Sequence, residues 1–133
     1  QRRLSIPTPS HEQYLEALLK RQRIRQGFME FFQDIDILIC PATAVSAPKH
    51  DLVEVDVDGT LNPGRTALMC TLVYDLTGAP AISVPVGKDT NGMPIGIQIV
   101  GRHFEEKTVL NAAAKLEDLS NLRNNVYGNE RNM

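Results

Sequence analysis

The chain has 133 residues, which is enough for one domain with a sizeable core but not for two. Its formal net charge of −2 gives no electrostatic reason to expect nucleic acid or an anionic membrane as a partner. Two cysteines, Cys40 and Cys70, form no CxxC pair and lie in apolar surroundings, so we expect reduced, buried thiols in a cytoplasmic protein. No apolar run reaches the length of a transmembrane helix.

The N-terminal third is predicted to hold one long helix. The chain begins with Gln1 and not with Met, so we expect it to be part of a longer protein, with the polar residues 1–9 as an N-terminal extension. The helix should start at Ser10, whose hydroxyl can cap it while Gln13 completes a capping box. Residues at helical spacing predict one apolar face, made of Tyr14, Leu15, Leu18, Leu19, Ile24, Phe28, Phe31, Phe32 and Ile35.

Four basic side chains gather in the middle of this helix, at Lys20, Arg21, Arg23 and Arg25. No aromatic residue interleaves with them, as it would in many nucleic-acid-binding patches. The cluster therefore favours a solvated helix face over an RNA-binding surface.

The stretch after this helix is predicted to be a short buried strand followed by a loop. The strand should cover Asp36–Cys40 and end at Pro41. Residues 42–62 show little regular pattern, with at most a short strand at Val53–Val57. His50 and the scattered carboxylates nearby lack any spacing that would fix a coordination sphere, so no metal site is expected.

A second helix is predicted from Asn62, acting as the cap, to Leu76, with Pro63 at the first helical position. Gly78 should end it in the left-handed conformation. Apolar residues at helical spacing predict its core-facing side, formed by Leu68, Met69, Leu72, Val73 and Leu76.

Two apolar runs, Ala81–Val86 and Ile95–Val100, predict strands that are buried on both faces. The residues between them carry turn chemistry, because Asn91 and Gly92 can adopt positive φ. An antiparallel hairpin is therefore expected. A third helix should follow Phe104 and pack through Val109, Leu110, Ala113, Leu116 and Leu119, and the Asn-rich residues 120–133 are predicted to be disordered.

The sequence contains no catalytic motif with the residue spacing that its chemistry requires. There is no GxSxG, HExxH or GxGxxG pattern, and Ser83 falls inside a predicted buried strand. His103 follows a strand end without a Ser or Cys partner and is expected to be a surface histidine. We predict no catalytic residue, no metal and no cofactor in this chain.

Several segments together resemble the amidase signature family. Residues 75–87, DLTGAPAISVPVG, and residues 91–101, NGMPIGIQIVG, are similar to the C-terminal part of that family. Upstream residues that resemble the family's helix and its strand ending in Pro are Tyr14, Arg23, Phe32 and the run 36–41, DILICP. The resemblance spans roughly residues 10 to 118. It implies an α/β class, as the C-terminal part of an α/β/α layered amidase-type fold with a mixed central sheet, and a segment 10–119 of an amidase domain.

The resemblance also implies what the chain lacks. Enzymes of this family cleave amide C–N bonds with a Ser nucleophile, a bridging Ser and a Lys, and the two serines lie in a Gly-Ser-rich segment far upstream of the part matched here. This sequence has no Ser-Ser pair and no such segment. Since a nucleophile needs its base within hydrogen-bond reach, the chain alone is predicted to be inactive. It should complete the sheet and one wall of the acyl pocket.

Two positions depart from the family pattern. Asp75 stands where members commonly carry Asn, and Leu68 falls where the A subunit of the glutamyl-tRNA amidotransferase places an Asp that holds the substrate amino group. The second departure favours a stand-alone amidase over a part of a tRNA-dependent amidotransferase. The chain could instead be a non-catalytic interaction or substrate-binding module, or a small α/β binding domain unrelated to amidases.

Thr71 and Tyr74 are the candidate substrate-binding residues, because the matching helix borders the acyl channel in enzymes that this chain resembles. The alternative is that Tyr74 only packs, with its hydroxyl at the rim. The expected ligand is a small-molecule amide, bound only together with the rest of the enzyme. The isolated chain is also expected to expose sheet edges and to self-associate.

Overall fold

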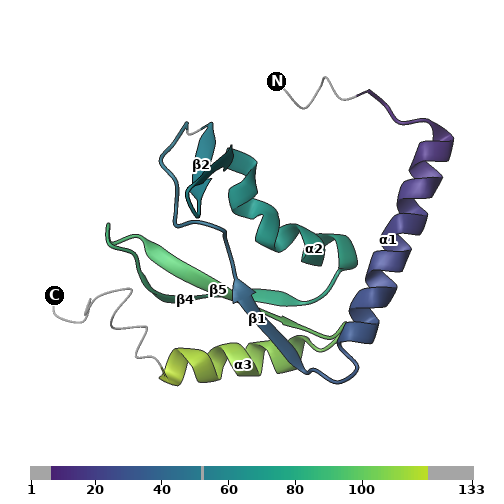
Figure 1. Ribbon diagram of the computed structural model, residues 1–133. Helices are drawn as coiled ribbons and strands as arrows, with labels where there is room; N and C mark the ends of the chain where they lie inside the picture. Colours follow the sequence, from purple (N-terminus) through teal and green to yellow (C-terminus); the bar gives the residue numbers. More distant parts are fainter. Residues whose placement is uncertain (1–6, 52, 120–133) are drawn as a thin grey trace.

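The structure, a computed structural model, describes residues 7–51 and 53–119 (Figure 1). It combines helices with two small sheets, which confirms the α/β class. Residues 1–6 of the expected extension and the predicted disordered tail 120–133 lie outside the described residues. The elements in chain order are α1 (His11–Phe31), β1 (Ile37–Pro41), β2 (Glu54–Val57), β3 (Thr60–Pro63), the 3₁₀ helix η2 (Gly64–Leu68), α2 (Met69–Thr77), β4 (Ala81–Lys88), β5 (Pro94–Gly101) and α3 (Glu106–Leu119).

The larger sheet has the strand order β1–β5–β4. Both neighbours of β5 run antiparallel to it, and Ile99 lies opposite Ile39 on one side and Ile82 on the other. The predicted hairpin of β4 and β5 is confirmed, and its turn uses the positive φ of Gly92, at 79°. The mixed sheet expected for a complete amidase-type fold needs parallel neighbours, and none of the pairs among the described strands is parallel.

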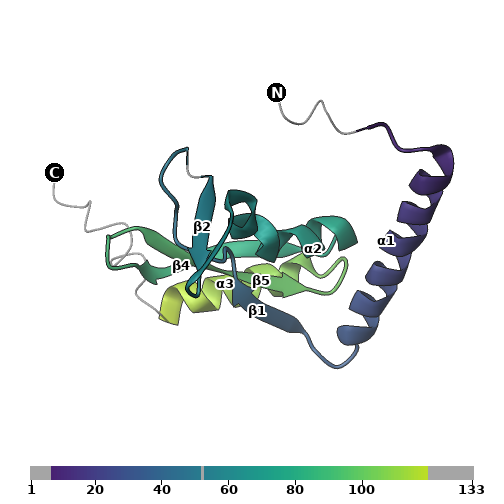
Figure 2. The same ribbon diagram turned by 45° about the horizontal axis from the view of Figure 1, so that its top comes forward.

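Helices cover both faces of this sheet, with α2 on one side and α3 on the other (Figure 2). Because side chains alternate along a strand, neighbouring residues of β5 enter different cores. Ile99 packs with Val84 and with Val109 and Ala113 of α3. On the α2 side, Val100 packs with Phe32 and Tyr74.

Burial on both faces is confirmed for the central strand but not for its neighbour. The last four residues of β5 are all buried, whereas Val84 is the one fully buried residue of β4 among those described. The prediction was wrong for β4 because this strand lies at the edge of the sheet formed by this chain.

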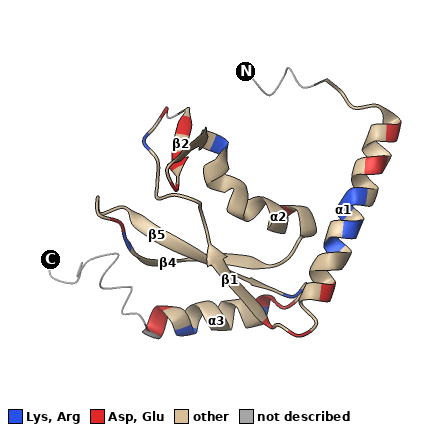
Figure 3. Cartoon of the chain, viewed as in Figure 1, with Lys and Arg blue, Asp and Glu red and all other residues tan. Residues whose placement is uncertain are grey.

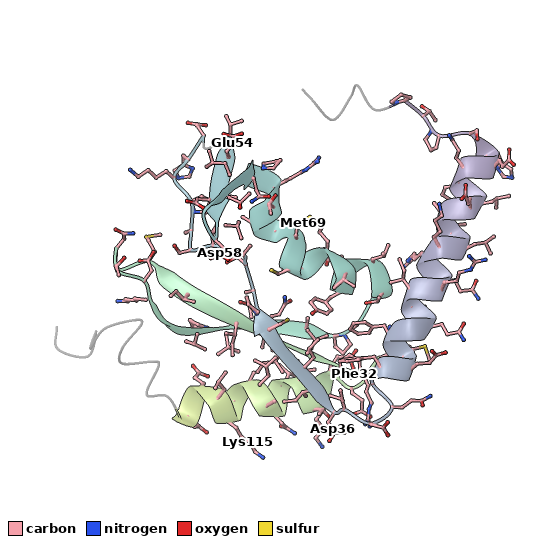
Figure 4. All side chains as sticks on the ribbon, viewed as in Figure 1. Phe32, Asp36, Glu54, Asp58, Met69 and Lys115 are labelled. Atoms are coloured by element: carbon pink, nitrogen blue, oxygen red, sulfur yellow. The ribbon has the colours of Figure 1, made fainter. Side chains whose placement is uncertain are left out.

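Helix α1 begins as predicted and packs less than predicted. The Ser10 hydroxyl accepts the Gln13 backbone N–H at 3.2 Å, and the Gln13 side chain accepts the Ser10 N–H at 2.8 Å, so the capping box is confirmed. The helix ends at Phe31, and none of its 21 residues is buried. Phe32, which follows it, is the point where this end of the chain enters the core (Figure 4).

The region between β1 and α2 differs from its prediction. The short strand allowed at Val53–Val57 is present as β2, but it pairs with β3, whose residues were expected to form a loop and the start of a helix, and Asp58 and Gly59 both have positive φ in the turn between them. Asn62 does not cap a helix but belongs to β3, and its side chain donates to the Thr60 carbonyl. The Asp-Gly pair, which is the strong signal for a tight hairpin turn, decides the local structure here.

Helix α2 packs against the sheet through the side opposite to the one predicted. The stripe expected in the core is exposed, and the buried residues of the helix are Tyr74 and Thr77. Both sides of α2 carry apolar groups, so periodicity alone could not choose between them. In α3, Val109, Ala113 and the half-buried Leu116 pack as predicted. Leu110 is exposed, and the side chain of Leu119 lies outside the described residues.

Candidate functional site

A cavity of about 750 Å³ opens between three segments that are distant in the sequence. They are the loop after β1, the helix η2, and the facing ends of β4 and β5. The residues that line it are Ala42, Thr43, Val45, Ala47, Pro48, Gly64, Ala67, Leu68, Ser83, Pro85, Lys88, Gly92, Pro94, Ile95 and Gly96. Its volume falls within the range of small-molecule sites.

Backbone hydrogen bonds hold the loop after β1 against both other walls of the cavity. The Ala42 N–H donates to the Gly96 carbonyl at 3.2 Å, and the Ala44 N–H donates to the Ala67 carbonyl at 3.1 Å. A hydrogen bond from Ser46 lowers the pKa of Asp89 in the β4–β5 turn, with further help from the Met93 N–H. The cavity is therefore held in shape by the fold before any ligand enters.

The lining is mostly aliphatic, with few polar groups. Lys88 is the one charged side chain among the described lining residues, and Ser83 and Thr43 contribute hydroxyls. A Cβ atom at Gly96 would lie 3.1 Å from the Ser83 Oγ, so glycine keeps the floor of the cavity open at this point. Such a lining suits an apolar group of a ligand, with polar contacts near the mouth.

The described residues of the cavity hold no nucleophile paired with a base. His103, the histidine weighed as a base, is directed elsewhere, because its Nε2 lies 2.9 Å from the Thr77 carbonyl. That bond and its half-buried position correct the expectation of a surface histidine. No hydrogen bond joins the Ser83 hydroxyl to His103 or to Lys88 among the described residues, so this part of the chain shows no activated serine.

Tyr74 lies in the core between α2 and the sheet. Its ring meets Phe28 edge-on, and its hydroxyl lies 3.2 Å from the Cys40 sulfur. Burial, with a smaller contribution from the bond to Cys40, raises the pKa of the Tyr74 phenol far above its usual value. The residue also borders a second depression of about 510 Å³ beside Gly78 and Ile82.

Thr71 is half-buried and donates its hydroxyl to the Leu68 carbonyl at 2.9 Å. It lies one turn beyond the residues of η2 that line the larger cavity, and neither it nor Tyr74 is among that lining. The substrate-binding role of Thr71 and Tyr74 stays a prediction.

Gln98 is a buried polar residue that the sequence patterns did not single out. Its side-chain amide donates to the Pro41 carbonyl at 3.0 Å and to the Cys70 carbonyl at 2.8 Å. These bonds join α2 to β1 across β5, next to the η2 helix and the loop after β1, which line the cavity. One polar residue in the middle of the apolar run IGIQIVG is the signal that could have identified it.

The described residues contain no group of three or more His, Cys, Asp or Glu side chains placed to hold a metal ion. The structure also has no helix, within the same residues, of the length and apolarity that a bilayer crossing needs.

Taken together, these features describe an α/β segment with a mostly apolar cavity whose volume is in the range of small-molecule sites. A model of the Amidase family matches residues 2–110. The chain therefore belongs to the amidase family.

Relatives of two kinds are similar to this chain. It is 41% identical over 107 residues to a fatty acid amide hydrolase of Medicago truncatula, and the match covers 80% of this chain and 18% of that protein. It is 43% identical over 106 residues to the A subunit of the glutamyl-tRNA(Gln) amidotransferase of Brevibacillus brevis, with 78% and 20% covered. The chain thus spans about a fifth of the length of these relatives.

Solved structures agree with this assignment. A crystal structure of an amidase superposes with a TM-score of 0.80 at 27% identity and covers 84% of this chain and 26% of that chain. The A subunit of the glutamyl-tRNA(Gln) amidotransferase of Thermotoga maritima superposes with a TM-score of 0.65 at 29% identity, with 80% and 22% covered.

Proposed function

We propose that this chain supplies one non-catalytic wall of the substrate pocket in an amidase that hydrolyses amide C–N bonds. In this proposal the Ser nucleophile, the bridging Ser and the Lys come from the remainder of the domain. The chain contributes the sheet that carries the pocket and the groups that contact the acyl part of the substrate.

The cavity of about 750 Å³ is the observation that carries this proposal. Its walls come from segments that lie within the range matched by the family, and its lining is mostly apolar, with the hydroxyls of Thr43 and Ser83 and the charged Lys88 as its polar groups. An uncharged acyl group would bury its carbon atoms there, and each buried methylene contributes about 0.8 kcal/mol.

Relatives named as the A subunit of an amidotransferase support a second candidate, a part of a tRNA-dependent amidotransferase. Leu68 bears on the choice. Its side chain lines the cavity and carries no charge, so it offers nothing to a substrate amino group. This lining favours a stand-alone amidase. The two free cysteines among the described residues support the cytoplasmic location that we propose with it.

A chimeric enzyme tests the proposal. Residues 10–119 would replace the matched segment of the Medicago hydrolase, and kcat/KM would be measured on anilides of increasing acyl length. We expect turnover, with Ala67→Leu lowering kcat/KM on long acyl chains by about tenfold and leaving the shortest anilide almost unchanged. Leu61→Ala, which alters an exposed residue outside the cavity lining, is the matched control. Equal losses on every substrate would contradict the proposal.

A further inference from the structure

Lys88 brings an unpaired positive charge to the cavity. Its side chain is exposed, and it makes no hydrogen bond or ion pair with the part of the chain that the structure describes. No carboxylate belongs to the described lining, and the acidic side chains of the β2–β3 hairpin, red in Figure 3, lie outside it. The ammonium group therefore has three donors that a ligand in the cavity can use.

A β-bulge in β4 turns Lys88 toward the cavity. Pro85 pairs with Gly96 of β5. Lys88 pairs with Pro94, so three steps along β4 match two along β5, and Val86 is the extra residue without a partner. Because side chains alternate along a strand, Lys88 would otherwise point to the face that α3 covers, whereas the bulge places it on the same face as Pro85. Bulges that re-aim a side chain in this way are frequent beside active sites.

The same face of the β4–β5 hairpin forms an apolar floor that leads away from this charge. Ser83 pairs with Gln98 of β5. Lys88 pairs with Pro94, four residues further along, so the Cα atoms of Ser83 and Lys88 lie about 13 Å apart. Pro85 lies between them and has no polar side-chain group. A ligand that spans this floor needs an apolar middle and finds a positive charge at one end.

Asp89, the residue after Lys88, does not neutralise this charge. Its carboxylate accepts the backbone N–H groups of Asn91 and Met93, both at 2.8 Å, and it is bonded to Ser46 as well. No ion pair joins it to Lys88 among the described residues. The carboxylate is used to hold the turn and the loop after β1, so Lys88 stays available to a ligand.

We propose that Lys88 determines the specificity for the acyl group and selects one whose far end carries a carboxylate, as in the monoamide of a dicarboxylic acid. The proposal rests on the proposed function for the amide. An amide is uncharged, so the ammonium group is matched by an anionic group at the other end of the acyl chain and not by the reacting end. The uncharged carbon chain between the two ends is buried on the apolar floor, and the carboxylate pairs with the exposed ammonium group.

Calorimetric titration of the 133-residue chain tests this proposal with two probes. One is the monoanilide of octanedioic acid, and the other is the same anilide with its carboxylate converted to a carboxamide, which keeps the shape and removes the charge. We expect Lys88→Gln to weaken binding of the carboxylate probe by about fivefold, the upper range for an exposed ion pair, and to leave the carboxamide probe unchanged. Salt at about 1 M should remove most of this difference, because it screens the pair.

Lys115→Gln is the matched control, because Lys115 is an exposed lysine on α3, on the other side of the sheet (Figure 4). It should leave both affinities unchanged. A loss by Lys88→Gln that is equal for the two probes, an equal loss by Lys115→Gln, or no measurable binding of the carboxylate probe would each overturn the proposal.

Turnover by the chimeric enzyme is read separately, so that the two proposals can fail independently. Binding of the carboxylate probe that depends on Lys88, without turnover of any anilide, sustains the role of Lys88 and contradicts the proposed function. Turnover with the same preference between the two probes before and after Lys88→Gln contradicts only the role of Lys88.

Discussion

The Tyr74 hydroxyl lies 3.2 Å from the Cys40 sulfur and so joins helix α2 to strand β1 inside the core. Burial of this phenol, more than the bond itself, raises its pKa far above the usual value. The pKa of Tyr74 therefore depends on the packing of α2 against the sheet, because that packing buries the phenol.

Stability should fall at high pH because of Tyr74. A phenol whose pKa is raised in the folded state contributes stability that is fully present below the unfolded pKa, about 10, and is lost as the pH rises further. The free energy of unfolding should therefore drop by up to about 1.4 kcal/mol per pH unit above pH 10, measured by urea denaturation. Tyr74→Phe should remove this part of the slope. Identical slopes in both proteins would contradict the buried position.

Arg102 should anchor the end of α1. Its Nε donates to the carbonyls of Phe32 and Ile35 at 2.8 and 3.2 Å, and its guanidinium pairs with Asp36 at 3.0 Å. Arg102→Ala leaves these carbonyls without their charged donor and should lower the free energy of unfolding by about 2 kcal/mol. Asp36→Asn, which removes only an exposed ion pair, should cost less than about 0.5 kcal/mol. Chemical denaturation of both variants separates the two contributions.

Two glycines should respond in opposite directions to the same substitution. A Cβ at Gly101 would meet the Val109 side chain at 2.5 Å, so Gly101→Ala should destabilise the fold by about 1–3 kcal/mol. At Gly27, within α1, nothing lies within 4 Å, and Gly27→Ala should stabilise by about 0.5–1 kcal/mol. Thermal melting of both variants checks this pair, and a loss at Gly27 equal to that at Gly101 would show that α1 is not helical there.

Thr71 should influence which acyl groups an assembled enzyme accepts. A larger side chain one turn from Leu68 would reshape the pocket wall, so Thr71→Phe should change the preference among acyl chain lengths by about 1–3 kcal/mol in relative kcat/KM. The smallest amide should react almost as before. A uniform loss on all substrates together with a lower melting temperature would mark Thr71 as a core position only.

Local patterns predicted local structure well in this chain. The capping box at Ser10, the left-handed Gly78 and the β4–β5 hairpin each follow from a few neighbouring residues, and the structure contains all three. The buried side of α2 could not be predicted, because Leu72 and Tyr74 lie on different sides of a helix that is apolar on both. Which side of α2 is buried depends on its hydrogen bonds to Gln98 and Cys40, which belong to strands distant in the sequence.

The candidate site was also beyond local patterns. Its cavity is lined by a loop, a 3₁₀ helix and a hairpin that lie up to about fifty residues apart in the sequence. No motif in any of these segments predicts that they come together. The Asp-Gly turn of the β2–β3 hairpin was a local signal that could have been used. Family resemblance, carried by residues 75–101, indicated the function class that the Amidase match over residues 2–110 supports.

Hydrolysis of a generic anilide by the purified 133-residue chain tests the central claim most directly, because that claim places every catalytic group outside this segment. We expect no turnover and no labelling by a serine-directed fluorophosphonate, since the chain has no Ser-Ser pair and the described residues of the cavity pair no nucleophile with a base. Turnover that the fluorophosphonate abolishes would contradict the claim.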